Sequence, residues 1–438
     1  MKLRNYNLIL VFFFSIIFPQ ESAREISLGG SVVTLSRGVF SVGINPANLA
    51  FSKENITLIN SNFTLYNNLI SLKVYNDLNG VNLEDNNSQI TKNEFFEILN
   101  GNSFKLYNFI NASLPGLNYL NSKYALTTKI KQFSKFDFGN EFFEIFLFGN
   151  KWQEEIDINF KISSQAVAEY GYSSWLNLEG LALGYTLKYL QGLYLYELTA
   201  LEKDNYLYTD STGLDMNITT KEEIYLGGSG FGIDIGINLN ELSRGYSVGL
   251  SITNILGYIN WDKNNLNYLF FGKNTFKKQN INAYKTKVNI LSINNFNASD
   301  LMTGSTGIAD SILFDTSYVE PLEYSVRKTD HPSILRFGIS KNFEKKINIA
   351  YESRTKFNHS DLNDYIWIHS LGLEILKWKN IPIRFGISSG NKFNHRFSFG
   401  SGLYINNIRF DIGASWIGSR QLYHANGFDF GISLSINN

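Results

Sequence analysis

The sequence predicts an all-β protein: an antiparallel transmembrane β-barrel of about 14 strands, with an N-terminal plug-like segment and long extracellular loops. Three observations predict this fold class. Several stretches alternate apolar and polar residues, their polar faces carry charges and glycines, and the connections between them sort by length. With 438 residues, the chain is long enough for one large all-β body or for two or three soluble domains.

The N-terminus predicts export. Lys2 and Arg4 precede an apolar stretch, Leu8–Phe18, that is too short to span a bilayer as a helix. We expect residues 1–23 to be a signal peptide cut after Ala23, residues 24–52 a plug or hatch segment, and residues 53–438 the barrel. The expected location is the bacterial outer membrane.

A short motif inside the expected plug is not strand-like. Asn45 can cap a helical turn, and Pro46 suits the first position of that turn while holding Asn45 extended. With Ala47 and Asn48, these residues predict a rigid corner before the first strand. Residues before Phe51 should therefore lie inside the barrel and not in its wall.

The barrel prediction rests on a period of two. In residues 428–436, Phe428 and Phe430 are each followed by a polar or small residue, Asp429 and Gly431. The same period recurs over residues 231–239, 335–340, 383–388 and 408–416. A soluble β-sandwich is the alternative. Segments of about 9 to 13 residues and whole charges on the polar face favour a membrane barrel.

Six charged residues lie on these polar faces, and we expect them to face the lumen: Asp234, Arg336, Arg384, Arg409, Asp411 and Asp429. The favoured interpretation is a salt-bridge network that braces the interior. A substrate site is the alternative.

The lengths of the connections give an independent test, because outer-membrane barrels have short periplasmic turns and long outer loops. Counting back from a last strand that runs toward the periplasm, the expected short turns are at 406–407, 379–380, 342–345, 240–243 and 191–192. The expected outer loops are near 417–423, 389–393, 354–366, 257–332, 203–227 and 165–177. Residues 56–75 form either one strand, which makes 14, or a hairpin at 67–68, which makes 15; an even number is favoured.

Three sections are expected to depart from plain strands and loops. Thr91 stands three residues before Glu94, a capping-box spacing, and Gly101 follows the predicted helix. Residues 140–150 predict another helix, with Asn140 as its cap. The section 257–332 is predicted to be a long extracellular excursion with a hairpin of its own.

Little in the sequence predicts catalysis. The five histidines show no metal-ligand spacing, so we expect no metal, no cofactor and no enzyme activity. The glycines of residues 227–236 run into a strand and are expected to leave room in the lumen rather than to bind a nucleotide. An outer-membrane hydrolase that uses His359 or His424, the first near Asp361 and Asp364, is the open alternative.

Composition also limits the partners. Charged residues make up 18% of the chain, against about a quarter in average soluble domains. The formal net charge is zero, so nothing predicts a nucleic-acid partner. The absence of cysteine excludes disulfides, thiolate metal sites and a cysteine nucleophile.

The stretch Leu28–Phe51 resembles the start of the FadL-type outer-membrane transporters of long-chain fatty acids and other hydrophobic compounds. It also resembles the PorV-like proteins of the type IX secretion system. Residues 227–236, 248–264 and 381–388 resemble, in the same order, an uncharacterised family of predicted outer-membrane proteins within that group.

The resemblance implies a 14-stranded barrel, an N-terminal hatch and an exit for ligand through the barrel wall. The corner and plug residues that it covers are Gly29, Gly30, Asn45, Pro46, Ala47 and Asn48. Asn48 stands where the transporters usually have glycine, and no ligand-binding residue of the transporters maps onto this chain.

These observations predict passive transport of small hydrophobic molecules across the outer membrane. The alternatives are a non-transporting barrel scaffold for a secreted or surface protein, as in the PorV-like proteins, and the hydrolase. The expected partners are outer-membrane lipid, a hydrophobic small-molecule ligand and, for the scaffold, a secreted or surface protein.

Overall fold

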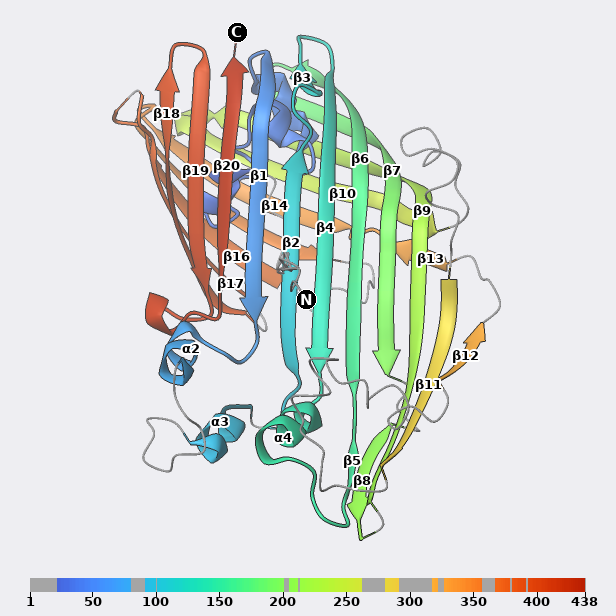
Figure 1. The fold of residues 1–438 in the computed structure, drawn as a ribbon. Coiled ribbons are helices and arrows are strands. Elements are labelled where there is room, and N and C mark those ends of the chain that lie inside the picture. The colour runs from blue at the N-terminus through green and yellow to red at the C-terminus, as the bar shows by residue number, and fades with distance from the viewer. Residues whose placement is uncertain are drawn as a thin grey trace, which may run out of the picture.

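The computed structural model describes residues 22–79, 91–99, 101–200, 205–211, 213–261, 280–290, 317–321, 327–356, 367–378, 380–390 and 393–437. Fourteen antiparallel strands form a closed barrel, as predicted (Figure 1). Around the wall they are β1 (Asn55–Asn67), β2 (Phe104–Ser113), β4 (Ala125–Phe138), β6 (Phe160–Leu178), β7 (Leu181–Ala200), β9 (Gly213–Leu242), β10 (Tyr246–Trp261), β14 (Ile334–Phe343), β15 (Ile347–Lys356), β16 (Trp367–Ile375), β17 (Ile383–Gly390), β18 (Phe393–Ile405), β19 (Ile408–Ile417) and β20 (Gly427–Asn437). β20 closes the barrel on β1, with Ile436 opposite Ile56 and Phe428 opposite Leu65.

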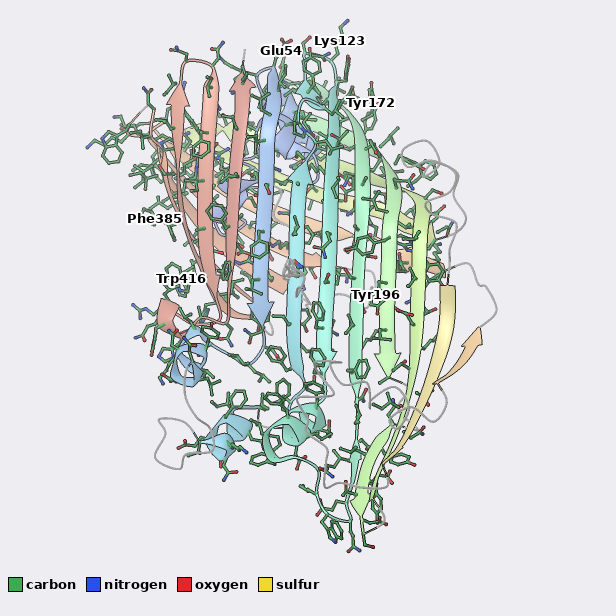
Figure 2. All side chains as sticks on the ribbon, in the orientation of Figure 1. Glu54, Lys123, Tyr172, Tyr196, Phe385 and Trp416 are labelled. Atoms are coloured by element: carbon green, nitrogen blue, oxygen red, sulfur yellow. The ribbon has the colours of Figure 1, made fainter. Side chains whose placement is uncertain are left out.

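The alternation predicted from the sequence separates the two faces of the wall. On β17, Phe385 is 50% exposed on the outside, whereas its neighbour Arg384 is fully buried inside. Figure 2 shows Phe385 and Tyr172 on the outer surface of the barrel. An apolar outer face and a polar inner face are what a barrel in lipid requires.

The connections sort by length between the two ends of the barrel. At the short-turn end, β14 and β15 are joined by residues 344–346, and β18 and β19 by residues 406–407. At the long-loop end, β1 and β2 are separated by residues 68–103, and β10 and β14 by residues 262–333. Both sets match the predicted sorting.

Three of the predicted connections are wrong. Gln191–Gly192 lies inside β7, and the turn between β6 and β7 is at Glu179 and Gly180, where φ is 47° and 98°. Gly192 is a packing position and not a turn, because a Cβ there would overlap the indole of Trp261. The expected loops near 165–177 and 203–227 fall mainly within β6 and β9. These strands and β7 have 19, 30 and 20 residues and so exceed the expected length.

The first strand is a single strand, not a hairpin, but it is shorter than residues 56–75. It ends at Asn67, whose side-chain Oδ1 accepts from the amides of Leu69 and Ile70 and so turns the chain. The helix α2 (Leu72–Leu78) follows.

Two further helices lie at the long-loop end, α3 (Lys92–Leu99) and α4 (Asn140–Phe148). The capping box of α3 is confirmed: Glu94 N–H donates to Thr91 Oγ1 at 3.3 Å, and Thr91 N–H donates to Glu94 at 2.9 Å. Asn140 is not the cap of α4, because the cap position is held by Gly139, which has no side chain for a capping hydrogen bond. None of the described helices is long and apolar enough to cross a membrane.

Short strands extend the sheet beyond the barrel: β5 (Glu155–Asp157), β8 (Tyr206–Asp210), β11 (Asn280–Ile290), β12 (Ser317–Pro321) and β13 (Arg327–Asp330). β9 continues past the long-loop end, where it pairs with β8 and β11. β11 pairs in turn with β12, which confirms the hairpin predicted within residues 257–332.

Candidate functional site

The N-terminal segment, Ser22–Ser52, lies against the inner wall near the short-turn end (Figure 1, blue). It contains α1 (Ala23–Ser27) and the 3-10 helices η1 (Gly38–Ser41) and η2 (Pro46–Phe51). Most of its residues are buried, including the carboxylate-bearing Glu25. The segment contains no strand and is not part of the wall. Its burial inside the barrel therefore requires space along the inner face of the wall.

The predicted corner motif is built as expected. Asn45 caps η2, with its Oδ1 accepting from Ala47 N–H at 3.1 Å, and Pro46 occupies the first position. The Nδ2 of Asn45 donates to two carbonyls at 3.1 Å, Val33 of the segment and Ile237 of β9. One side chain therefore holds the turn, the preceding loop and the wall together.

Asn48 works in the same way. Its Nδ2 donates to Val33 O at 2.9 Å and to Ser36 Oγ at 2.6 Å, and its Oδ1 accepts from Asn238 of β9. Gly29 and Gly30 have φ of 62° and 92°, which glycine adopts without strain.

Nine glycines on the inner face of the wall make room for the segment. We call them the glycine track: Gly184, Gly236, Gly249, Gly338, Gly372, Gly386, Gly400, Gly413 and Gly431. A Cβ on Gly236 would overlap Asn45, and one on Gly386 would overlap the backbone of Gly29. Ala23 and Ser27 lie against β18–β20, and Pro46 and Ala47 lie against Gly184 of β7. The segment thus follows the track around the wall.

Charged side chains join the start of the segment to the wall. Arg24 donates from Nε and Nη2 to the two carboxylate oxygens of Glu374, at 2.9 and 2.7 Å. Glu374 also accepts from Arg384 Nε at 2.8 Å, and Arg384 Nη1 lies 2.6 Å from Asp411. Each of these four charged side chains therefore contacts one of opposite sign.

A second group of charges surrounds Glu25. Its carboxylate lies 2.9 Å from Arg336 Nη1 and 3.4 Å from Arg354 Nη1. Arg336 also pairs with Glu352 at 3.0 Å. The other oxygen of Glu352 accepts from the amides of Val32 and Val33, at 2.8 and 2.7 Å. Residues of the wall therefore bind the Glu25 side chain and the backbone amides of Val32 and Val33.

A third group lies across the lumen, on β4, β6, β7 and β9. Lys188 is 2.8 Å from Asp234, and Lys131 is 3.0 Å from Glu169. His331 Nε2 contacts Glu169 at 2.8 Å. On the other side, Asp429 pairs with Arg396 at 3.0 Å.

The structure places five of the six predicted lumen charges in these ion pairs. The exception is Arg409, which is half-buried and whose guanidinium lies 5.0 Å from the ring centre of Tyr404. The sequence analysis missed other members of the network: Arg24, Glu25, Lys131, Glu169, Lys188, Glu352, Arg354, Arg396 and Glu374. The period of two could have found Glu352 and Arg354, because both alternate with outward residues of β15.

An apolar layer crosses the lumen on the long-loop side of these ion pairs. Tyr66, Phe109 and Phe133, from β1, β2 and β4, are clustered with isoleucines from the facing strands. These isoleucines are Ile334, Ile368 and Ile417, from β14, β16 and β19. A second apolar cluster includes Trp261, Tyr225 and Leu190. The described lumen thus has an apolar layer between its buried ion pairs and the ion pairs of Asp137 with Lys105 and Lys135 nearer the long-loop end.

The wall is interrupted between β1 and β4. β2 ends at Ser113, and the short strand β3 (Asn118–Leu120) resumes the pairing with β1 and β4. The intervening residues 114–117 include Pro115, which has no amide hydrogen to donate, and Leu117, which is 56% exposed.

An apolar groove of about 720 Å³ adjoins this interruption on the outer face. Its lining includes Leu117, Leu126, Tyr172, Leu187 and Phe231. Gly171 of β6 also lines it, and on the inner side a Cβ at Gly171 would lie 3.6 Å from Val42 of the N-terminal segment. At this point the backbone of the wall and the side chains of Thr127 and Thr186 separate the groove from the segment.

The part of the chain that the structure describes holds no group of three or more His, Asp or Glu residues suited to a metal. His424 is exposed on the 3-10 helix η5 (Leu422–His424). His359, Asp361 and Asp364 lie outside the described residues.

A family model described as a family of unknown function, DUF5723, matches residues 46–414. The chain belongs to the DUF5723 family. A search of curated proteins finds no match for this DUF5723 protein.

Solved structures share the fold of this DUF5723 protein. The toluene transporter TodX of P. putida matches with a TM-score of 0.52 and 12% identity, over 95% of this chain and 98% of its own. A Pseudomonas aeruginosa FadL homologue matches with a TM-score of 0.52 and 10% identity, over 97% and 100%. The Ralstonia pickettii toluene transporter TbuX matches with a TM-score of 0.51 and 12% identity, over 96% and 100%. The protein therefore shares the β-barrel fold of these three structures.

Proposed function

We propose that this protein passes small hydrophobic molecules across the outer membrane without energy input, and that they leave through the barrel wall beside residues 114–117. The observation that carries the proposal is the interrupted strand position between β1 and β4, next to an apolar groove. The shared fold with transporters of toluene supports the same substrate class.

The polarity of the lumen supports a lateral route. A hydrophobic molecule that enters at the long-loop end passes the partly exposed ion pairs of Asp137 and then meets the apolar layer around Phe109 and Phe133. Beyond it lie the buried ion pairs and the N-terminal segment, which we propose acts as a plug. Passing straight through would separate paired charges, whereas the groove is lined mainly by apolar side chains.

Uptake into liposomes tests this proposal. The purified full-length protein is reconstituted, and uptake of radiolabelled toluene and of longer alkylbenzenes is compared with that of empty liposomes. We expect uptake to exceed that of empty liposomes and to need no ion gradient. If no member of the hydrophobic panel enters faster than into empty liposomes, the proposal is wrong.

A scaffold for a secreted or surface protein is the second candidate. The observation that favours it is the sheet of β8, β9, β11 and β12 that projects beyond the long-loop end. Crosslinking in intact cells followed by detergent extraction should then recover a stoichiometric partner, and a lone monomer would count against it. The hydrolase stays a prediction that rests on His359 and His424.

A further inference from the structure

A small pocket of about 230 Å³ lies at the short-turn end, between the N-terminal segment and the last strands. Four cationic side chains line it: Arg24 and Arg37 of the segment, Lys53 before β1, and Arg409 of β19. The only carboxylate among its lining residues is Asp411. So many cations around a space of this size suggest a negatively charged occupant.

Arg37 has only neutral acceptors. Its Nη1 donates to the carbonyls of Thr34 and Ser36, at 2.9 and 2.8 Å, and its Nη2 to Asn240 Oδ1 at 3.3 Å. Burial, together with the nearby charge of Arg24, lowers the pKa of Arg37 to about 10, so that it remains charged at neutral pH. Glu374 and Glu241 act in the opposite direction on this pKa, but neither forms an ion pair with Arg37.

Arg409 likewise contacts a neutral group. Its guanidinium lies over the ring of Tyr404 at 5.0 Å. Within the described residues, no carboxylate lies within ion-pair distance of Arg37 or Arg409.

Two carboxylates near the pocket, Asp411 and Glu374, already have partners. Asp411 lies 2.6 Å from Arg384 Nη1 and accepts from the Tyr404 hydroxyl at 3.1 Å. Glu374 is shared by Arg24 and Arg384. The pocket therefore has a surplus of positive charge that its own acids do not offset.

The remaining lining can donate hydrogen bonds. It includes the hydroxyls of Ser433 and Ser435 and the amide of Asn437. A guanidinium presents its N–H groups in a planar fork that matches a carboxylate or phosphate. A volume of about 230 Å³ is several times the roughly 30 Å³ share of one water, which leaves room for an oxyanion group and a few more atoms.

We propose that this pocket binds an oxyanion, a phosphate or carboxylate group, between Arg37 of the N-terminal segment and Arg409 of β19. The bound anion links Arg37 of the segment to Arg409 of the wall, two cations for which the described residues provide no ion-pair partner. This goes beyond the proposed transport function, because the anion is not the hydrophobic cargo. Its source is either a free oxyanion of the periplasm or the phosphate headgroup of a lipid.

Thermal unfolding of the full-length protein tests the proposal in two arms. One arm compares phosphate with chloride at equal ionic strength in a non-ionic detergent. The other compares nanodiscs with and without phosphatidylglycerol. We expect a rise of at least about 2 °C in the midpoint in one or both arms, because a ligand bound only by the folded state stabilises it. A rise with phosphate identifies a free oxyanion, and a rise only with phosphatidylglycerol identifies a headgroup.

Arg409→Gln should abolish the rise in either arm and Arg409→Lys should retain part of it. Arg420→Gln, an exposed arginine at the opposite end, should leave it unchanged. Arg409 makes no ion pair that its loss would break, so Arg409→Gln should fold, which the heat-dependent gel mobility of the barrel checks. An equal rise in Arg409→Gln, or no rise in either arm for the natural protein, would overturn the proposal.

Discussion

The guanidinium of Arg24 binds both oxygens of the buried Glu374 carboxylate, at 2.9 and 2.7 Å, and so ties the N-terminal segment to β16. The two residues are 350 positions apart in the chain. Glu374 also accepts hydrogen bonds from Arg384 and Asn348, so three donor side chains share this carboxylate. We therefore expect the seating of the segment to depend on this one carboxylate.

Replacing Glu374 tests that dependence. Glu374→Ala leaves Arg24 and Arg384 without this acceptor, and removal of one partner of a buried ion pair costs about 3–5 kcal/mol. Denaturant unfolding in detergent should show a loss of that size. The control is Glu344→Ala, which removes an exposed ion pair with Lys346 and should change stability by less than about 1 kcal/mol. Equal effects of the two changes would contradict the assignment.

The glycine track predicts a contrast within one strand. Gly236→Ala places a Cβ onto Asn45 and Pro46, whereas Gly232→Ala meets nothing closer than 3.8 Å on the same strand. We expect Gly236→Ala to cost about 1–3 kcal/mol by overpacking and to speed tryptic cleavage at Arg37. Gly232→Ala should behave like the natural protein in both measurements. Unchanged proteolysis of Gly236→Ala would show that the segment does not depend on this close contact.

Asn45 combines a cap with two wall contacts, and two substitutions separate these roles. Asn45→Asp keeps the acceptor for Ala47 N–H but loses the donors to Val33 and Ile237. Asn45→Ala loses the cap as well, which costs about 0.5–2 kcal/mol more. Hydrogen exchange of the amides of residues 47–51 should therefore rise in the order natural protein, Asn45→Asp, Asn45→Ala. The same exchange rate for both variants would mean that the cap contributes nothing.

The contacts of Ser22 and Ala23 bear on the cut expected after Ala23. Ser22 Oγ accepts from Glu25 N–H at 3.2 Å and caps α1, and Ala23 is fully buried against Gly413 and Gly431. A cut after Ala23 would remove this cap and these contacts. We therefore predict that the mature protein retains Ser22, which N-terminal sequencing of protein from the outer membrane can establish. A mature chain that starts at Arg24 would show that these contacts are dispensable.

The sequence could predict the place of a residue where a pattern relates that residue to its neighbours in the chain, and not where its contacts lie far away in the chain. Arg384 could be placed inside the barrel because a period of two relates it directly to Phe385. Arg24 and Glu25 could not be assigned partners, because the N-terminal segment has no period and its contacts lie hundreds of residues away.

Local signals also misled where tertiary packing decides the structure. Gln191–Gly192 has the composition of a turn, yet Gly192 serves the packing of Trp261 on the inner face. The interruption at residues 114–117 did carry a signal, Pro115-Gly116, but only the structure shows that it lies between β2 and β3 in one strand position, where Leu114 N–H still donates to Thr128 O.

The most direct test of lateral passage is toluene uptake by liposomes that contain Leu117→Asp. Leu117 is 56% exposed beside the groove, so a carboxylate there should hinder apolar cargo while it spares the fold. Leu371→Asp, at 50% exposure on β16 away from the groove, is the matched control. We predict that uptake falls at least about fivefold in Leu117→Asp, a barrier increase of about 1 kcal/mol, and stays at the natural level in Leu371→Asp. Equal uptake by all three proteins would contradict a route through the wall at this site.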